Sequence, residues 1–416
     1  MKAIINARIY DFETYIENGY VVYNKSIIDV GEMKDYKGHY EVYDAKGKLL
    51  IPGLINGHTH IYSTLFRGAP LQASPNNFLE ILDQIWWKFD KELTILSIQE
   101  SAKAYGQMSL LCGVTSLIDH HASGEITGSL SAIHEELDKL NMKHLLCFET
   151  SDRFDVNQCI EENIKTSIHK GHFGLHASLS LSDETLEQVS EVINDKPIHI
   201  HVAESKIDED LCESNYDCRV VERLNTFGLL NKDSILAHCL YINDLEASLI
   251  KIKGCYVAIN PSSNLNNAVG LYNNELLMTH DIPVLVGTDG LGANIAKAYQ
   301  NLYFVGNQSR NHPSKVSLEW IRKQLLTSYD YFNRLYGCRV GRIKKEYDSD
   351  FLLIDYESIT PMNENNAFGH LVFGVFEALR PYAVFIRGEL QVDQNQLILK
   401  EKINQETIEA LWRNLI

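Results

Sequence analysis

The sequence predicts an α/β protein in which a (β/α)8 barrel of the TIM type stands beside a small β-sandwich-like domain. Between residues 53 and 290 one unit recurs: a short apolar, β-branched run, a polar turn and a helical pattern. Both ends of the chain instead alternate like short strands. With 416 residues, the chain is long enough for a barrel of about 250 residues and a smaller unit.

The barrel is predicted from eight apolar runs, each of which we expect to form one parallel strand. They span residues 54–60, 114–120, 144–150, 173–179, 198–204, 235–240, 256–261 and 282–289. Helical patterns separate them. In the segment after the fourth run, Ser182 can cap a helix, and Leu186, Val189 and Ile193 then share one face.

The small domain is predicted from alternating segments at both ends of the chain. These segments are 3–11, 15–24 and 26–32 at one end, and 350–356, 383–391 and 396–400 at the other. No flexible linker separates them from the barrel. We therefore expect residues 1–51 and 346–416 to form one composite β domain, and residues 52–345 to form the barrel.

Composition and charge exclude several classes of function. Hydrophobic residues make up 45% and charged residues 22%, as in an ordinary soluble globular protein. The formal charge of −17 repels nucleic acid and anionic membrane surfaces. The start resembles no signal peptide, and no run approaches the roughly 20 apolar residues that span a bilayer. These features predict a cytoplasmic protein whose partner is a small molecule, with neither nucleic acid nor a membrane involved.

The strongest chemical signal is the segment Asn56-Gly57-His58-Thr59-His60 at the end of the first predicted strand. Residues two apart on a strand point to the same face, so both imidazoles can bind one metal ion. Barrel enzymes place their active sites at this end of their strands. The eight cysteines include no Cys-x-x-Cys pair, which argues against a cysteine-ligated zinc site.

Other predicted strands also end in residues that can bind a metal. They are His176 on the fourth strand, His201 on the fifth, His238 on the sixth and Asp289 on the eighth. Any one of them alone would more often be a structural residue. His199 lies two residues deeper than His201, so we expect it to support the site from below. Glu204 follows His201 just past the strand end, where its carboxylate can reach a substrate.

These segments resemble the amidohydrolase superfamily. PGLINGHTH, GLHASLSLSDETL, HIHVAES, ILAHCLYI, NPSSNLNNA and VGTDG match its strand-end motifs in order, and the similarity covers nearly the whole chain. Within the superfamily, the chain looks most like the branch of deaminases and chlorohydrolases. FLEILDQIWWKFDKELT and DHHASGEITGSL are most similar to the SsnA-type aminohydrolases, whose activity is itself inferred.

The resemblance implies a ligand set. His58, His60, His201 and Asp289 would bind one divalent metal, while His238 and Glu204 line the reaction centre. His176 would contact the substrate or the attacking water. Relatives with two metals carry a lysine on the fourth strand, and here that strand has none, which implies a single ion. Three imidazoles and a carboxylate suit Zn²⁺, and Fe²⁺ is possible.

The expected reaction is hydrolytic deamination of a purine-like or other nitrogen heterocycle by a metal-activated hydroxide. Asp289 would accept the proton of the water, Glu204 would protonate the ring nitrogen, and His238 would orient the attacking oxygen. Opening of a cyclic amide and dehalogenation of a ring remain open alternatives, and a barrel without catalysis is a weaker one.

Residues outside this centre are predicted from their place in loops. Arg153 follows the third strand and is expected to bind substrate, as are Arg67 and Trp86 after the first strand. Gly287 to Gly292 do not have the spacing of a dinucleotide-binding loop, which argues against an oxidoreductase. Members of this branch commonly form homodimers, in which residues 81–93 would lie near the neighbour's site, so a homodimer is expected by resemblance.

Overall fold

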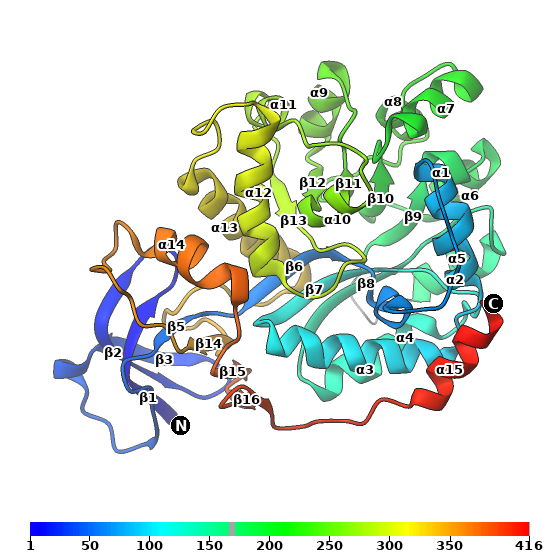
Figure 1. Cartoon of the computed structure of the whole chain (residues 1–416). Helices are drawn as coiled ribbons and strands as arrows, with labels where there is room; N and C mark the ends of the chain where they lie inside the picture. The colour runs from blue at the N-terminus through cyan, green and yellow to red at the C-terminus, as the bar shows by residue number, and fades with distance from the viewer. Residues whose placement is uncertain (166–170, 416) are drawn as a thin grey trace.

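The computed structural model describes residues 1–165 and 171–415, and it confirms the predicted barrel with a β-rich domain built from the chain ends. Residue 416, the last of the predicted small domain, lies outside this range. Figure 1 shows the β-rich domain beside the barrel, with the N-terminal strands and the orange segment near residue 370 in the same unit.

Eight parallel strands form the barrel. They are β6 (Leu54–Thr59), β7 (Val114–His121), β8 (Lys143–Phe148), β9 (Phe173–Ala177), β10 (Ile198–Val202), β11 (Ile235–His238), β12 (Tyr256–Ile259) and β13 (Val284–Val286). Hydrogen-bonded ladders join β6 to β8 and β9 to β13. Single bridges, Thr150 with Leu175 and Thr59 with Asp289, connect the two groups, so the strands close into a ring.

Each expected apolar run overlaps one of these strands, and most strands end before the run does. At several carboxyl ends the chain leaves the ladder through left-handed backbone conformations, as at Ala203, His238 and Asp289. The residues past each strand end are therefore free to turn their side chains over the barrel mouth.

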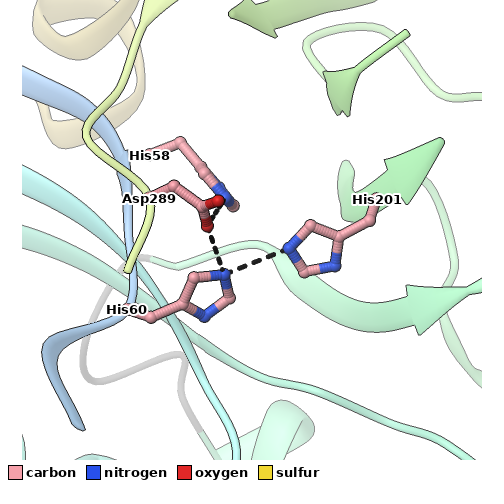
Figure 2. A group of neighbouring side chains, drawn as sticks. All are labelled: His58, His60, His201 and Asp289. Atoms are coloured by element: carbon pink, nitrogen blue, oxygen red, sulfur yellow. Dashed lines mark hydrogen bonds and ion pairs between the residues drawn. The ribbon is translucent and has the colours of Figure 1, made fainter. Parts of the chain in front are cut away.

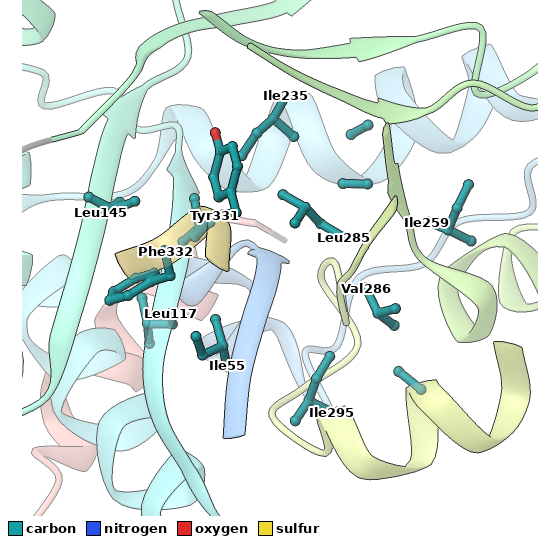
Figure 3. Packing of buried hydrophobic residues seen from close by; sticks show 14 of the residues in the cluster. Ile55, Leu117, Leu145, Ile235, Ile259, Leu285, Val286, Ile295, Tyr331 and Phe332 are labelled. Carbon is teal, nitrogen blue, oxygen red and sulfur yellow. The ribbon is translucent and has the colours of Figure 1, made fainter. Parts of the chain in front are cut away.

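Helices cover the outside of the barrel. They are α3 (Ile95–Leu111), α4 (Ser129–Lys139), α5 (Val156–Lys165), α6 (Asp183–Val192), α7 (Lys206–Tyr216), α8 (Val220–Thr226), α9 (Asp244–Lys253), α10 (Pro261–Asn266), α11 (Asn274–Thr279), α12 (Ile295–Ser309) and α13 (Leu318–Tyr336). The Ser182 side chain caps α6 by accepting a hydrogen bond from the Thr185 backbone N–H, as its sequence predicts. Figure 3 shows Ile55, Leu117 and Leu145 of the strands packed with Tyr331 and Phe332 of α13.

The β-rich domain contains one sheet of nine strands. They are β1 (Lys2–Tyr10), β2 (Tyr15–Tyr23), β3 (Ile27–Glu32), β4 (Glu41–Asp44), β5 (Leu49–Pro52), β14 (Phe351–Ile354), β15 (Ala383–Ile386), β16 (Glu389–Asp393) and β17 (Gln396–Leu397). The antiparallel pairing of β14 with β5 joins the two ends of the chain. Arg387 and Gly388, both at positive φ, turn the segment expected as one strand at 383–391 into the β15–β16 hairpin. The boundaries at residues 51/52 and 345/346 stay predictions.

The C-terminal region contains helices that its alternating pattern did not indicate. α14 (Ala367–His370) and two short turns, η6 (Leu371–Val375) and η7 (Phe376–Ala378), follow β14. The last helix, α15 (Gln405–Asn414), packs on α3 of the barrel (Figure 1), and Trp412 Nε1 donates a hydrogen bond to the Leu65 carbonyl at 2.8 Å. The chain end is thereby held on the barrel. Among the described residues, no helix combines the length and apolar character that a membrane span requires.

Candidate metal centre and substrate pocket

Four predicted ligands meet at the carboxyl end of the barrel. His58 and His60 come from β6 and the residue after it, His201 from β10, and Asp289 from the loop after β13; Figure 2 shows them converging. Asp289 Oδ1 lies 3.3 Å from His58 Nε2 and 3.0 Å from His60 Nε2. All four are buried, and one ligand atom from each lies within 4.8 Å of the others.

The hydrogen bonds behind these rings test whether the group fits a divalent metal. His60 Nδ1 donates to the His120 carbonyl at 2.7 Å, and His201 Nδ1 donates to the His176 carbonyl at 2.9 Å. In each neutral ring Nε2 therefore carries a lone pair, and the two Nε2 atoms face each other at 3.1 Å. Ligand atoms about 2.0–2.1 Å from a tetrahedral Zn²⁺ stand about 3.3 Å apart, so this spacing fits such an ion.

The third imidazole is oriented by another histidine. His58 Nδ1 lies 2.7 Å from His199 Nε2, deeper in the barrel, while His58 Nε2 is buried without a hydrogen-bond partner on the metal side. Such partners fix the tautomer of a metal-binding histidine. His199 therefore lies beneath the metal ligands, as expected from its position two residues deeper than His201 on the same strand.

Burial and neighbouring charges set the protonation of these groups. Burial lowers the pKa of His58 to about 3 and that of His201 well below its usual range, which keeps both rings neutral, the form that binds metal. Burial also lowers the pKa of His60, but Asp289 and other carboxylates outweigh it and raise that pKa to about 9. A metal ion would compete with this proton, because both are stabilised by Asp289.

A second trio adjoins the ligands. Glu204 Oε2 lies 3.5 Å from His238 Nε2, which in turn lies 3.9 Å from Asp289 Oδ2. His238 Nδ1 donates to Asn264 Oδ1 at 2.8 Å, so Nε2 faces the two carboxylates. Burial raises the pKa of Glu204 to about 7, with Asp289 adding to the rise and His238 opposing it. The trio can therefore hold a proton within reach of a reacting molecule.

The backbone is strained at the ends of the three strands, β10, β11 and β13, that carry this trio. Ala203 has φ 46°, His238 has φ 72° and Asp289 has φ 53°, all in the left-handed region that side chains disfavour. Strained conformations of this kind persist where the surrounding structure fixes them, and they cluster at functional sites. Here they turn Glu204, His238 and Asp289 toward one another over the end of the barrel.

A pocket lies above the metal group, and its empty space, part of which is open to solvent, is about 800 Å³. One wall comes from the chain after β6, which forms η2 (Ile61–Phe66), α1 (Phe78–Ile81), a π-helical turn η3 (Leu82–Trp86) and α2 (Trp87–Lys91). The aromatic lining side chains in this wall are Tyr62, Phe78, Trp86 and Trp87. Ser263 and Asn267, after β12, line the opposite side beside Glu204. The pocket thus combines aromatic side chains on one wall with polar side chains beside the metal group.

The two predicted substrate-binding residues differ in position. His176 lines the pocket, and its Nε2 lies 3.7 Å from Glu149 Oε1. Arg153 does not line it: its guanidinium lies 3.0 Å from Asp90 Oδ2 and 2.8 Å from Glu149 Oε1. This geometry favours an indirect role for Arg153, through the two carboxylates, over direct contact with a substrate.

The other two loop residues expected at the substrate also differ in position. Trp86 lines the pocket, whereas Arg67 is exposed and does not line it.

The residues after β12 also contact the site. Ser263 lines the pocket and donates a hydrogen bond to Asp289 Oδ2 at 2.5 Å. Asn264 orients His238, and Ser262 accepts a hydrogen bond from Asn301.

Sequence reasoning missed several polar residues of the site. Glu149 lies just past β8 and His120 lies within β7, so the strand-end criterion that selected His176 applied to them as well. Asp90 and Asp208, by contrast, come from helices, and only the path of the loops brings their carboxylates to the pocket. Periodicity does not reveal that path.

Comparisons with known proteins agree with this geometry. The 5′-deoxyadenosine deaminase of Methanococcus maripaludis is 27% identical, over 98% of this chain and 97% of that protein. The 5-methylthioadenosine/S-adenosylhomocysteine deaminase of Clostridium tetani is 24% identical, over 93% and 92%. A solved adenosine deaminase from Xanthomonas campestris with bound zinc superposes with a TM-score of 0.81, at 19% identity over 100% of this chain and 97% of the other.

The family model confirms the resemblance found in the strand-end motifs. It matches residues 49–390, which include every strand of the barrel and all four members of the candidate metal group. Such a match covers most of the chain, so the protein belongs to the amidohydrolase family.

Proposed function

We propose that this protein hydrolytically deaminates an adenine-type nucleoside, with one Zn²⁺ ion as its cofactor. The observation that carries the proposal is the position of Glu204 and His238, 3.5 Å apart and directly beside the metal group on the pocket floor. The relatives named as deaminases of 5′-deoxyadenosine and of 5-methylthioadenosine/S-adenosylhomocysteine support the substrate class. The enzyme is a hydrolase of non-peptide C–N bonds.

His58, His60, His201 and Asp289 would hold the metal ion. When bound, the ion acts as a Lewis acid that makes water a nucleophile near neutral pH. The donor set suits zinc, and the zinc-bound relative in the fold comparison supports this choice.

A single ion is favoured by the charges around the next candidate group. Glu149, His176 and His201 also bring their ligand atoms within 4.8 Å of one another. The Arg153 guanidinium, however, already lies 2.8 Å from Glu149 Oε1. A second cation there would have to displace this guanidinium or bear its repulsion.

The protein side chains handle the protons of the reaction. Asp289 Oδ2 accepts a proton from the attacking water, and His238 Nε2 orients the water toward the ring carbon that bears the amino group. Glu204 Oε2 delivers a proton to the adjacent ring nitrogen, so that no full charge develops on the ring. Asp289 then passes its proton to the amino group, the C–N bond breaks, and ammonia leaves. The hydroxyl group gives its proton to Glu204 and becomes the oxo group of the ring, so both carboxyl groups return to their starting states.

A homodimer and a cytoplasmic location are part of the same proposal. The eight cysteines are all free thiols, as is typical of proteins in a reducing compartment. We propose the dimer because members of this family branch commonly form homodimers. Analytical ultracentrifugation at micromolar concentration would detect it, and a monomer would refute it.

The test is ammonia release from a panel of aminated purine nucleosides in isotopically labelled water. The proposal predicts one ammonia per oxo product and one labelled oxygen in that product. Release of ammonia without label would contradict hydrolysis. Turnover confined to cyclic amides would replace deamination by ring opening.

A further inference from the structure

Two acidic side chains line the pocket wall near β8 and α2, and the guanidinium of Arg153, which does not line the pocket, contacts both. Asp90 and Glu149 line the pocket, and their side chains are 2% and 3% exposed. The Arg153 guanidinium contacts both carboxylates and lies against the faces of Trp87 and Phe154, at 5.1 and 4.7 Å from the ring centroids. Two carboxyl groups share one guanidinium, and burial raises the pKa of Asp90 to about 7, so near neutral pH this wall is neutral or negative and has no positive charge to spare.

The remaining lining offers an anion no positively charged side chain. Among the described residues, the lining includes no lysine or arginine, and its carboxylates are Asp90, Glu149, Glu204, Asp208 and Asp289. Asp208 already accepts hydrogen bonds from the backbone N–H groups of Ala203 and Leu179. The other lining side chains are aromatic, aliphatic or uncharged polar groups such as Ser63 and Asn267, and Leu291 in this lining is 46% exposed.

We infer that the pocket selects adenine-type substrates whose part remote from the purine has no net negative charge, and excludes those with a phosphate. The inference rests on the proposed function, because it assumes that the purine lies at the metal group. An anionic tail would lose its hydration among carboxylates and aromatic rings without gaining a cationic partner. The net charge of −17 adds long-range repulsion.

The inference separates neutral nucleosides from nucleotides. 5′-Deoxyadenosine and 5-methylthioadenosine, compounds named for the two relatives, are uncharged beyond the purine. We expect both to be substrates of this enzyme. Adenosine 5′-monophosphate has a negatively charged phosphate beyond the purine, and we expect it to be excluded.

The closing experiment measures binding and turnover separately on the zinc-loaded enzyme. Isothermal titration of the neutral nucleosides and of adenosine 5′-monophosphate should give a dissociation constant about 100-fold weaker for the nucleotide, the size expected for an unpaired charge in such a site. Binding of the nucleotide within about threefold of the neutral compounds would overturn the inference. Selective binding of the neutral compounds without any ammonia release would leave the inference standing and refute the deaminase proposal. Absence of binding by every nucleoside would refute both.

A charge introduced into the wall gives a second, independent test. Leu291→Arg places a cation at the pocket opening, and Leu245→Arg adds the same charge on α9, where Leu245 is 67% exposed and does not line the pocket. The ratio of anion to neutral binding should rise roughly tenfold in Leu291→Arg and stay unchanged in the control. A folded Leu291→Arg variant with the wild-type ratio would overturn the inference.

Discussion

His60 Nε2 and His201 Nε2 lie 3.1 Å apart, although the opposite nitrogen of each ring donates its hydrogen to a main-chain carbonyl. With both rings neutral, each Nε2 presents a lone pair to the other, and one cation between them can use both as ligands. Without a metal, the raised pKa of His60, about 9, keeps a proton on that ring in the same place. The contact therefore marks a position that either a proton or a metal ion fills.

Removing the metal should therefore abolish activity and lower stability. At a metal concentration 100 times the dissociation constant, binding to the folded state alone contributes about 2.7 kcal/mol. Chelation followed by thermal unfolding should show this loss as a lower melting temperature. Zinc should restore both properties. Magnesium should not, because it prefers oxygen ligands. Full activity of a demonstrably metal-free protein would contradict the metal-dependent mechanism.

His199 should control metal affinity through His58. Replacing His199 by Phe removes the ring 2.7 Å from His58 Nδ1 and should weaken zinc binding about 10–100-fold, as the loss of such partners does elsewhere. Competition with a chromophoric chelator measures this. The control is His172→Phe: His172 is also buried in the barrel, but its Nε2 bonds to Tyr331 and not to a metal-group residue. Equal loss of affinity in both variants would point to general damage to the barrel.

The fold and the positions of the metal group could be predicted from the sequence, because both depend on the periodicity of the strands. The eight apolar runs mark the strands, and parallel strands bring their carboxyl ends to one rim, so His58, His201 and Asp289 had to be neighbours once the barrel closed. The depth of His199 followed from the same two-residue period.

The walls of the pocket could not be read in the same way. Asp90 reaches the site through a segment of short helices and a π-helical turn after β6, and Arg153 contacts Asp90 without lining the cavity itself. These positions depend on tertiary contacts between two loops far apart in the sequence. Similarly, residues 383–391 alternate like one strand, yet Gly388 lets the chain fold back into a hairpin.

Glu209 should make stability depend on pH. Burial, reinforced by the neighbouring Glu246, raises its pKa from 4.5 to about 8. The folded protein therefore binds the proton of the Glu209 carboxyl group more tightly than the unfolded chain does. The stability that this protonated carboxyl group contributes is present below pH 4.5 and is lost as the pH rises through about 8. Glu209→Gln should stabilise the protein by about 1–3 kcal/mol at pH 8.5 and have little effect at pH 4.5, since one pKa unit corresponds to about 1.4 kcal/mol.

Chemical denaturation of the zinc-loaded protein across this pH range measures the effect. The matched control is Glu213→Gln, because Glu213 also pairs with Arg219, at 2.7 Å, but its side chain is 51% exposed. The control should show the pH dependence of the wild type. A Glu209→Gln variant with that same dependence would show that Glu209 is ionised in the folded protein.

The central claim is that Glu204 transfers a proton during a metal-dependent deamination. The most direct measurement compares ammonia release from 5′-deoxyadenosine by the wild type and by Glu204→Gln, with the metal content of each determined on the same samples. Glutamine keeps the size of the side chain and cannot transfer a proton, so the account predicts about one zinc per chain in both proteins and a loss of turnover of about 10²–10⁴-fold in the variant. A zinc-loaded Glu204→Gln protein with wild-type turnover would contradict it.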